Sequence, residues 1–192
     1  PPIHTLVKTS VFFQNSLLLN SLTHQISFKN RLINFLKFSY LKYYNQNDYN
    51  WVVQTPYIDK LLQTHLNINS NNIFIYPVIK EESEPFSAKK GINNFVYVSS
   101  GVSHKNHERL LKAFIEAANK ADRGITLHLT LNKEELAEKI YPKNLKVKFH
   151  GTLSRGSVNE LYDSCDFAIY PSLVESFGLP LIEATNHGCK VI

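Results

Sequence analysis

The sequence contains no methionine, only two cysteines and no hydrophobic run of about 18 residues. Without such a run we expect no transmembrane helix in these 192 residues, and no secretory signal is recognisable. Cys165 and Cys189 lie in apolar surroundings and lack the spacing of a metal motif. This pattern indicates reduced, buried thiols in a cytosolic protein and argues against a disulfide framework.

Three motifs that define large enzyme classes are also absent: Gly-x-Ser-x-Gly, the Walker-type phosphate loop and Gly-x-Gly-x-x-Gly. Serine hydrolases, P-loop nucleotidases and dinucleotide-dependent dehydrogenases therefore lack their minimum parts here. Histidine is more frequent, but no metal-binding spacing is found among His104, His107, His150 and His187. We interpret these histidines as structural residues and expect no metal site.

The composition that remains is typical of a soluble globular protein, with 43% hydrophobic and 19% charged residues. The net charge is +5, and the residues before Asp48 contain no acidic side chain. The basic residues in that part are Lys8, Lys29, Arg31, Lys37 and Lys42. This asymmetry indicates that the N-terminal part contacts an acidic surface, and it gives little support to nucleic-acid binding.

The first half of the chain combines short apolar runs with helical patterns. A Thr-Pro pair at 55–56 predicts a helix start, with Ile58, Leu61 and Leu62 facing inward. The expected elements are strands within 5–14, at 51–54 and at 73–77, and helices at 26–44 and 57–66.

The helix expected at 26–44 is basic and rich in aromatic residues. Its apolar residues share one broad face, while Phe38 and Leu41 fall on the polar side. The members of the apolar face are Leu32, Ile33, Phe35, Leu36, Tyr40 and Tyr43. Two interpretations stay open: the helix lies on an anionic membrane surface, or its apolar face packs on the sheet of a Rossmann-like domain.

Residues 80–93 are polar and rich in Lys, Glu, Ser, Pro and Gly, and we place a domain boundary there, near Glu84. The expected domains are therefore 1–83 and 84–192. In the second, strands alternate regularly with helices, which predicts a parallel, doubly wound α/β sheet. The strands are expected at 95–99, 125–130, 145–149 and 166–170, and the helices at 106–120, 133–140, 156–164 and 180–188.

Ligands of such sheets bind at the carboxyl ends of the strands, where the loops 100–105, 150–155 and 171–178 should converge. In the last of these, Gly178 and Pro180 predict a helix start whose N–H groups, from Phe177 to Leu179, favour an anion. Glu183 follows among apolar neighbours, and Glu175 lies in the loop. Either the two carboxylates accept hydrogen bonds from the hydroxyls of a sugar, or Glu175 is a solvated loop residue and Glu183 compensates the helix dipole.

Lys105 precedes Asn106, a plausible N-cap, and should project beside a helix N-terminus in a geometry that suits a diphosphate. A solvated loop lysine is the alternative. Gly151 follows the strand expected at 145–149, where it either lets backbone approach a ligand or turns the chain.

The segment Glu175-Ser-Phe-Gly-Leu-Pro-Leu-Ile-Glu183-Ala resembles the Glu, seven residues, Glu signature of glycosyltransferase family 4. The resemblance implies the GT-B architecture: two Rossmann-like domains with parallel sheets, both incomplete in this chain. Residues 51–77 resemble the end of the family's N-terminal, acceptor-side domain. Ser-Gly-x-x-His-Lys-Asn-His at 100–107 resembles a bacterial subgroup that builds surface polysaccharides, although Ser99 and Ser100 replace the usual Gly-Arg pair.

The resemblance implies transfer of a sugar from a nucleoside-diphosphate-sugar donor to a glycan or lipid-linked acceptor, with retention and without a metal or other cofactor. Glu183 would bind the ribose hydroxyls and Glu175 would face the transferred sugar. Lys105 would neutralise the departing diphosphate. The remaining donor-binding candidates are Ser172, Gly151 near the base, and the backbone of Phe177, Gly178 and Leu179.

Two alternatives stay open: a nucleotide-sugar epimerase of the same fold, which needs no acceptor, and a non-catalytic module that binds a nucleotide or a membrane. The chain begins Pro-Pro and stops at Lys190-Val191-Ile192, which resembles the beginning of a strand. We therefore expect a piece of a longer protein. We expect that protein to be cytoplasmic, with a peripheral position at the inner membrane face.

Overall fold

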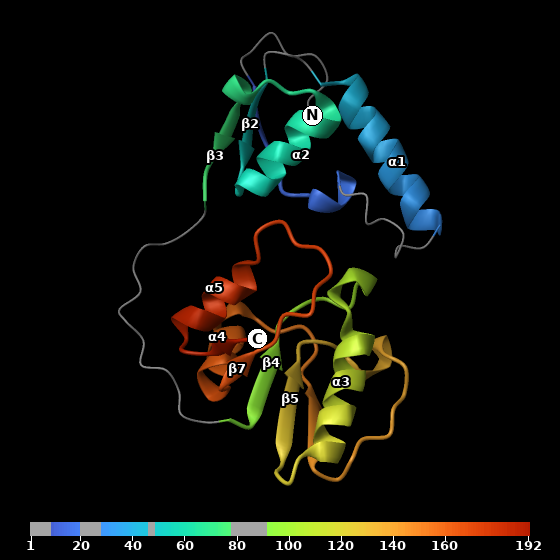
Figure 1. Ribbon diagram of the computed structural model, residues 1–192, viewed down its shortest axis with the longest axis vertical. Coiled ribbons are helices and arrows are strands. Elements are labelled where there is room, and N and C mark those ends of the chain that lie inside the picture. Colours follow the sequence, from blue (N-terminus) through green and yellow to red (C-terminus); the bar gives the residue numbers. More distant parts are fainter. Residues whose placement is uncertain (1–8, 20–27, 46–48, 78–91) are drawn as a thin grey trace. The chain divides into compact units, whose positions relative to one another are not determined.

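The computed structural model describes residues 9–19, 28–45, 49–77 and 92–192 (Figure 1). Contacts within the chain divide it into two units. The first comprises Pro1–Glu81 and Val174–Phe177, and the second Glu82–Leu173 and Gly178–Ile192. Most of the expected linker, including the boundary near Glu84, lies outside the described residues.

The first unit is built on a parallel three-stranded sheet. β2 (Asn50–Val53) lies between β1 (Ser10–Phe12) and β3 (Ile73–Ile75). Single turns of 3-10 helix, η1 (Ser16–Leu18) and η3 (Ser70–Asn72), flank the outer strands. Trp51 and Val53 on the central strand are fully buried. The strands expected at 51–54 and 73–77 are confirmed, and β1 lies within 5–14, whose first four residues are outside the described part.

α2 (Pro56–Leu66) follows β2 and covers the sheet. The Thr55 side chain accepts a hydrogen bond from the Ile58 backbone N–H at 3.3 Å, and Pro56 is the first helical residue. Ile58 and Leu62 are buried and Leu61 is partly buried, so the predicted inward face is confirmed.

α1 (Phe28–Tyr43) lies within the helix expected at 26–44. Of the two interpretations left open for its broad apolar face, inward packing is contradicted. Phe38 and Leu41 pack into the core of the first unit instead. The expected face is exposed, from 38% at Ile33 to 80% at Tyr43. Two large apolar side chains one turn apart are enough to attach the helix, and helical periodicity alone does not say which of two apolar stripes a neighbouring sheet accepts.

The second unit contains a parallel five-stranded sheet in the order β6-β5-β4-β7-β8. The strands are β4 (Asn94–Tyr97), β5 (Ile125–Leu129), β6 (Leu145–Phe149), β7 (Phe167–Ala168) and β8 (Lys190–Val191). β4 lies at the centre of this order. β5 and β6 are added on one side of it and β7 and β8 on the other, as in doubly wound folds, and a crevice forms where the side changes.

Helices cover both faces of this sheet (Figure 1). Phe95 and Tyr97 of β4 pack with α3 (His107–Lys120), whereas Val96 packs with α4 (Arg155–Ser164). This alternation is the two-residue period of a strand buried on both sides. α5 (Leu179–Asn186) joins the α4 side, where Ala184 is fully buried. The predicted doubly wound arrangement is therefore confirmed.

One expected helix, 133–140, is not formed. Only the 3-10 turn η5 (Lys133–Glu135) is present, and residues 136–144 are irregular. The Ala137 N–H donates to the Glu108 side chain of α3 at 3.3 Å, and Lys139 forms an ion pair with the same carboxylate at 2.6 Å. The Ala137 N–H, which a helix would pair with a backbone carbonyl, is satisfied by the Glu108 carboxylate instead.

Smaller differences concern element ends. α5 begins at Leu179, so Pro180 is the second helical residue and not the first, and β7 is shorter than expected. Among the described helices, none is long and apolar enough to cross a membrane.

Candidate active site

Tyr97, the last residue of β4, connects two loops at the carboxyl edge of the sheet. Its side chain is 1% exposed. Its hydroxyl lies 2.7 Å from Ser172 Oγ and 3.0 Å from the Lys105 carbonyl oxygen. The Leu173 N–H also donates to the His104 carbonyl at 2.9 Å. The loops after β4 and after β7 therefore meet, as the sequence predicts.

Asn106 lies at the N-cap position of α3, in the left-handed conformation (φ 63°), but it does not cap the helix. Its side-chain amide donates to the Pro171 carbonyl at 3.1 Å instead. Asn tolerates this conformation better than most residues. Lys105, immediately before it, ends the 3-10 turn η4 (Ser103–Lys105).

The Tyr170 ring connects Lys105 to the start of α5. The Lys105 ammonium lies 5.9 Å from the ring centroid. A Cβ placed on Gly178 would be 3.9 Å from Tyr170 Cε1. A cation over an aromatic ring is held by the ring quadrupole. Lys105 and the α5 N-terminus thus border the same aromatic side chain.

Gly178 is the N-cap of α5 with φ 79°, a conformation that suits glycine, and Leu179 is the first helical residue. A side chain on Gly178 would also press on Leu181. The first N–H groups of a helix have no partner within it and attract anions. Gly178 and Leu179 are therefore positioned as predicted, while Pro180 contributes no N–H.

Glu183 has a partner that sequence reasoning missed. Its Oε1 lies 3.1 Å from Nη2 of Arg155, the first residue of α4. The Glu183 side chain is 24% exposed and that of Arg155 is 80% exposed. The signal for Arg155 was its place in the loop 150–155, directly after the N-cap Ser154 and at the same sheet edge as Glu183.

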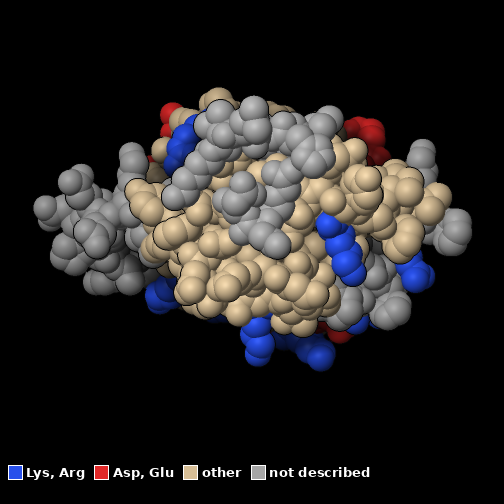
Figure 2. Space-filling model, turned by 90° about the horizontal axis from the view of Figure 1, so that it is seen from above, with Lys and Arg blue, Asp and Glu red and all other residues tan. Residues whose placement is uncertain are grey.

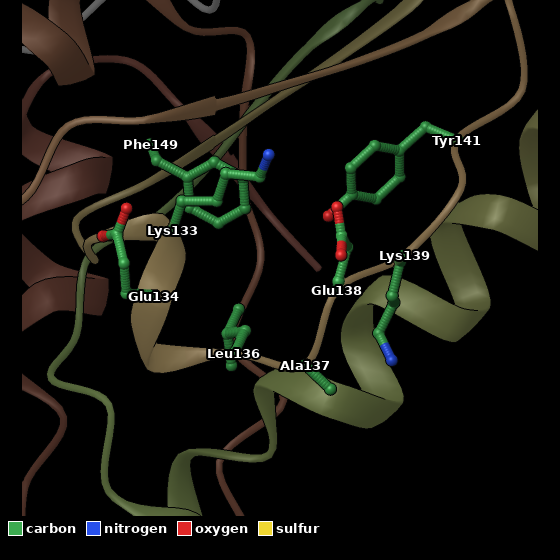
Figure 3. A pocket seen from close by; sticks show the side chains of 8 residues that line it. All are labelled: Lys133, Glu134, Leu136, Ala137, Glu138, Lys139, Tyr141 and Phe149. Atoms are coloured by element: carbon green, nitrogen blue, oxygen red, sulfur yellow. The ribbon is translucent and has the colours of Figure 1, made fainter.

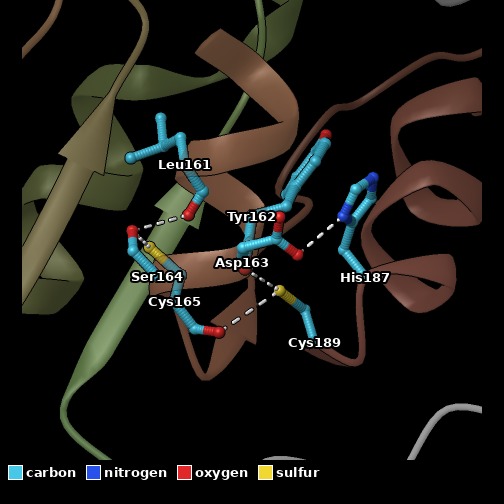
Figure 4. Close-up of polar contacts among 7 residues, drawn as sticks. All are labelled: Leu161, Tyr162, Asp163, Ser164, Cys165, His187 and Cys189. Atoms are coloured by element: carbon cyan, nitrogen blue, oxygen red, sulfur yellow. Dashed lines mark hydrogen bonds and ion pairs between the residues drawn. The ribbon is translucent and has the colours of Figure 1, made fainter. Parts of the chain in front are cut away.

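Several contacts hold α5 against α4. The Tyr162 hydroxyl donates to the Pro180 carbonyl at 3.3 Å, and His187 Nδ1 lies 2.8 Å from the Asp163 carboxylate. The Cys189 thiol donates to the Tyr162 carbonyl at 3.2 Å (Figure 4). Burial raises the pKa of Tyr162, and the Glu183 charge raises it further, so its hydroxyl stays neutral. Cys189 and Cys165 are both buried thiols, and neither is part of a disulfide.

The loops after β4, β5 and β6 are also joined. Ser99 Oγ lies 2.9 Å from His107 Nε2, and the Ser99 N–H donates to Thr130 Oγ1 at 3.0 Å. Burial lowers the pKa of His107, which favours its neutral form. Gly151 has φ 66°, and a Cβ there would lie 2.8 Å from Asn132 Oδ1. Gly151 therefore serves a tight turn that packs on the loop after β5.

Glu175 and Phe177 belong to the segment Val174–Phe177, which groups with the first unit. The other predicted site residues, Lys105, Gly151, Ser172, Gly178, Leu179 and Glu183, all lie in the second unit, and its geometry applies to them. Within the described residues, no group of three or more His, Cys, Asp or Glu side chains is placed to hold a metal ion.

A separate cavity of about 260 Å³ lies where the expected helix 133–140 is missing (Figure 3). Phe149 of β6 and Tyr141 of the irregular segment both line it, and Figure 3 shows them facing it from different elements. None of the predicted site residues lines it, and its charged lining residues are of both signs: Lys133, Glu134, Glu138 and Lys139.

The family model described as "Glycosyl transferases group 1" matches residues 78–192, more than half of the chain. No curated protein matches the sequence. Among solved structures, TarM is similar with a TM-score of 0.52 and 19% identity, over 74% of this chain and 28% of TarM. A mutant of S. aureus TarM in complex with Fondaparinux, alpha-GlcNAc-glycerol and UDP is similar with a TM-score of 0.59 and 15% identity. The match covers 95% of this chain and 36% of that chain.

The pneumococcal O-GlcNAc transferase GtfA in complex with UDP and GlcNAc is similar with a TM-score of 0.52 and 20% identity, over 73% of this chain and 29% of GtfA. These similarities show the GT-B type of α/β fold. The chain spans about a third of the length of the structures that it matches.

Proposed function

Because the chain belongs to the family of group 1 glycosyl transferases, we propose that it moves a sugar from a nucleoside-diphosphate sugar to a glycan or lipid-linked acceptor, with retention of configuration. One observation carries this proposal. The Lys105 ammonium and the glycine-led start of α5 border the same Tyr170 ring, which supports a site where a cation and helix N–H groups bind one diphosphate.

Each candidate residue has a role in this reaction. Lys105 and the α5 N-terminus stabilise the negative charge that grows on the leaving diphosphate, and such electrostatic stabilisation usually lowers the barrier more than any other single effect. Glu183 accepts hydrogen bonds from the ribose hydroxyls, and Glu175 faces the transferred sugar. Ser172, Gly151 and the backbone of Phe177 complete the donor site.

On this proposal no metal is required, because Lys105 and helix N–H groups meet the phosphate charge. Transfer should therefore persist in excess EDTA. Loss of transfer in EDTA, with recovery on adding Mg²⁺ or Mn²⁺, would contradict this part of the proposal.

The donor site is tested by calorimetric titration of the protein with UDP, GDP and ADP and their sugar conjugates. UDP is tested first, because the GtfA and mutant TarM structures contain it. We expect one saturable nucleotide, bound at least about tenfold more weakly by Glu183→Ala, because hydrogen bonds to a carboxylate are lost. Glu160→Ala, an exposed glutamate of α4, is the matched control.

Product analysis then separates the alternatives. A transferase forms a new glycoside only when an acceptor is present. An epimerase releases nucleotide or free sugar without an acceptor, and a binding module releases neither. Absence of any nucleotide binding at millimolar concentration by a folded protein would refute the donor site.

The exposed face of α1 supports a second role, docking on an anionic membrane at its cytoplasmic side. Phe35 and Leu36 are 65% and 59% exposed. The helix carries basic residues without an acidic one. An apolar groove of about 400 Å³ lies between the helix and Phe13. Figure 2 shows a face dominated by uncharged side chains, with Lys and Arg more prominent than Asp and Glu.

Vesicle sedimentation tests the membrane role. We expect binding to phosphatidylglycerol vesicles, weaker binding to phosphatidylcholine, and at least about a fivefold loss for Phe35→Ser with Lys42→Gln, because apolar area and charge both contribute. Ile140→Ser, which changes a 94% exposed side chain elsewhere, is the control. Equal binding by all variants would exclude α1 as the docking surface.

A further inference from the structure

The Arg155–Glu183 ion pair joins two helices whose other contacts already fix their relative position. The Tyr162 hydroxyl of α4 donates to the carbonyl of Pro180 in α5. Asp163 of α4 pairs with His187, the residue that follows α5 (Figure 4). Arg155 therefore adds little to the docking of α5. Its side chain is 80% exposed, and ion pairs at such exposure contribute little to stability.

The start of α4 is itself well defined. The Ser154 hydroxyl accepts a hydrogen bond from the Ser157 N–H at 3.2 Å, which fixes Arg155 as the first helical residue. Its guanidinium then reaches across to a carboxylate that is three-quarters buried. A carboxylate that is largely buried needs polar partners. Arg155 provides one, as the cation of the ion pair.

The contact uses only part of the carboxylate. Two oxygens offer about four acceptor positions, and the 3.1 Å contact with Arg155 Nη2 occupies one of them, on Oε1. The other positions can accept hydrogen bonds from a ligand, while the planar guanidinium restricts the rotation of the group. A carboxylate held in this way presents two acceptors in a fixed plane, which is the requirement for binding a pair of neighbouring hydroxyls.

We propose that Arg155 is a positioning residue that holds the Glu183 carboxylate in the orientation that accepts the ribose hydroxyls of the donor nucleotide. The proposal rests on the function proposed above, in which Glu183 binds the ribose. It predicts that Arg155 acts on recognition of the hydroxyls and not on the diphosphate or the fold.

The test compares UDP, or whichever nucleotide binds, with its 2′-deoxy analogue in calorimetric titrations. Wild-type protein should prefer the ribonucleotide by at least about tenfold, because the analogue leaves a carboxylate acceptor unmatched. Arg155→Ala should reduce this preference at least about threefold and leave affinity for the deoxy analogue within about twofold. Arg155→Lys should restore part of the preference, since one donor is enough for the Oε1 contact.

Two further variants control the test. Arg123→Ala removes an exposed arginine at the amino end of β5 and should leave the preference unchanged. In a Glu183→Ala background, Arg155→Ala should have no further effect on the preference, because the two residues act as a unit.

The possible results are distinguishable. Equal losses for the ribonucleotide and the deoxy analogue would show that Arg155 contacts another part of the ligand, and an unchanged or increased preference would show no positioning role; either result overturns the proposal. If wild-type protein binds no nucleotide, the proposed function fails and this inference fails with it. A lowered Tm in Arg155→Ala with an unchanged preference would indicate a structural role only.

Discussion

At the scale of single residues, Tyr97 shows how one buried hydroxyl can organise a site that it does not enter. It binds Ser172 and the Lys105 carbonyl while its ring packs against His107 and Tyr170. Two loops that carry candidate donor-binding residues thus share one hydrogen-bonding group at the end of a central strand.

Tyr97→Phe removes this hydroxyl and keeps the ring. We expect kcat for sugar transfer to fall about three- to tenfold, because the Lys105 loop loses an anchor. Unfolding free energy should fall by only about 1 kcal/mol, the net value of a typical hydrogen bond. Chemical denaturation and steady-state kinetics measure the two effects, and Tyr57→Phe, at a 47% exposed site in the first unit, serves as the control. Unaltered kinetics would show that the loops do not depend on this hydroxyl.

Gly151 gives a second prediction at this scale. Its φ of 66° and the nearby Asn132 oxygen both oppose a side chain. Gly151→Ala should therefore lower the unfolding free energy by about 1–3 kcal/mol. Gly124→Ala is the matched control, because a Cβ there meets nothing closer than 4.0 Å. If both variants are equally stable, the turn after β6 adapts without strain.

At the scale of elements, β5 and β6 bring two histidines together. His128 Nδ1 lies 3.0 Å from His150 Nε2, and the rings are stacked at 5.2 Å. Burial lowers the pKa of His128 to about 4, and the positive charges of Lys148, His150 and Lys146 act in the same direction. Burial and Lys148 also lower the pKa of His150. Both rings are therefore neutral at pH 7.

This pair should make stability depend on pH. Between pH 6.5 and about 4 the unfolded chain binds a proton at His128 that the folded protein does not. The neutral His128 ring thus contributes fully to the unfolding free energy above pH 6.5. This contribution, at most about 3 kcal/mol, is lost as the pH falls to about 4. We expect His128→Asn to flatten the decline of Tm over this window, and His65→Asn, an exposed histidine of α2, to leave it unchanged. Parallel Tm curves for all three proteins would refute this assignment.

The elements also show what the sequence could and could not predict. Strands β4 to β6 and helices α2 to α4 follow from hydrophobic periodicity, and α2 and α4 also have side-chain caps, at Thr55 and Ser154. The helix expected at 133–140 does not form, since Glu108 of another helix competes for its Ala137 N–H. The inward stripe of α1 depends on which neighbours are present, which a helical pattern does not contain.

The candidate site also combines features that the sequence predicts with features that depend on distant contacts. The meeting of the loops after β4 and β7 was predictable because strand-end loops of a parallel sheet converge. The roles of Lys105, Gly178 and Glu183 stay predictions, based on that convergence and on the resemblance to a known signature. Arg155 and Tyr97 were not predicted. Their importance comes from side-chain contacts across 28 and 75 positions of sequence, to Glu183 and Ser172 respectively. No local pattern encodes such contacts.

At the scale of the whole molecule, each unit has its own hydrophobic cluster: one around Trp51 and Leu62, and others around Val96 and Leu127. Separate cores allow separate unfolding, so a single free energy of unfolding need not describe the chain. The family match lies entirely in 78–192, the part that carries Lys105 and Glu183.

Trp51 is the one tryptophan of the chain, and it is fully buried in the first unit. Its fluorescence therefore reports the folding of that unit alone, whereas far-ultraviolet circular dichroism reports helices of both. Each of the variants Leu62→Ala and Leu127→Ala should lower the unfolding free energy of its own unit by about 2–5 kcal/mol. In a urea titration, Leu62→Ala should therefore lower the midpoint of the fluorescence transition, whereas Leu127→Ala should shift only the dichroism transition. A fluorescence midpoint that moves equally in both variants would mean that the two cores unfold as one. The chain thus carries an intrinsic optical reporter for one of its two units.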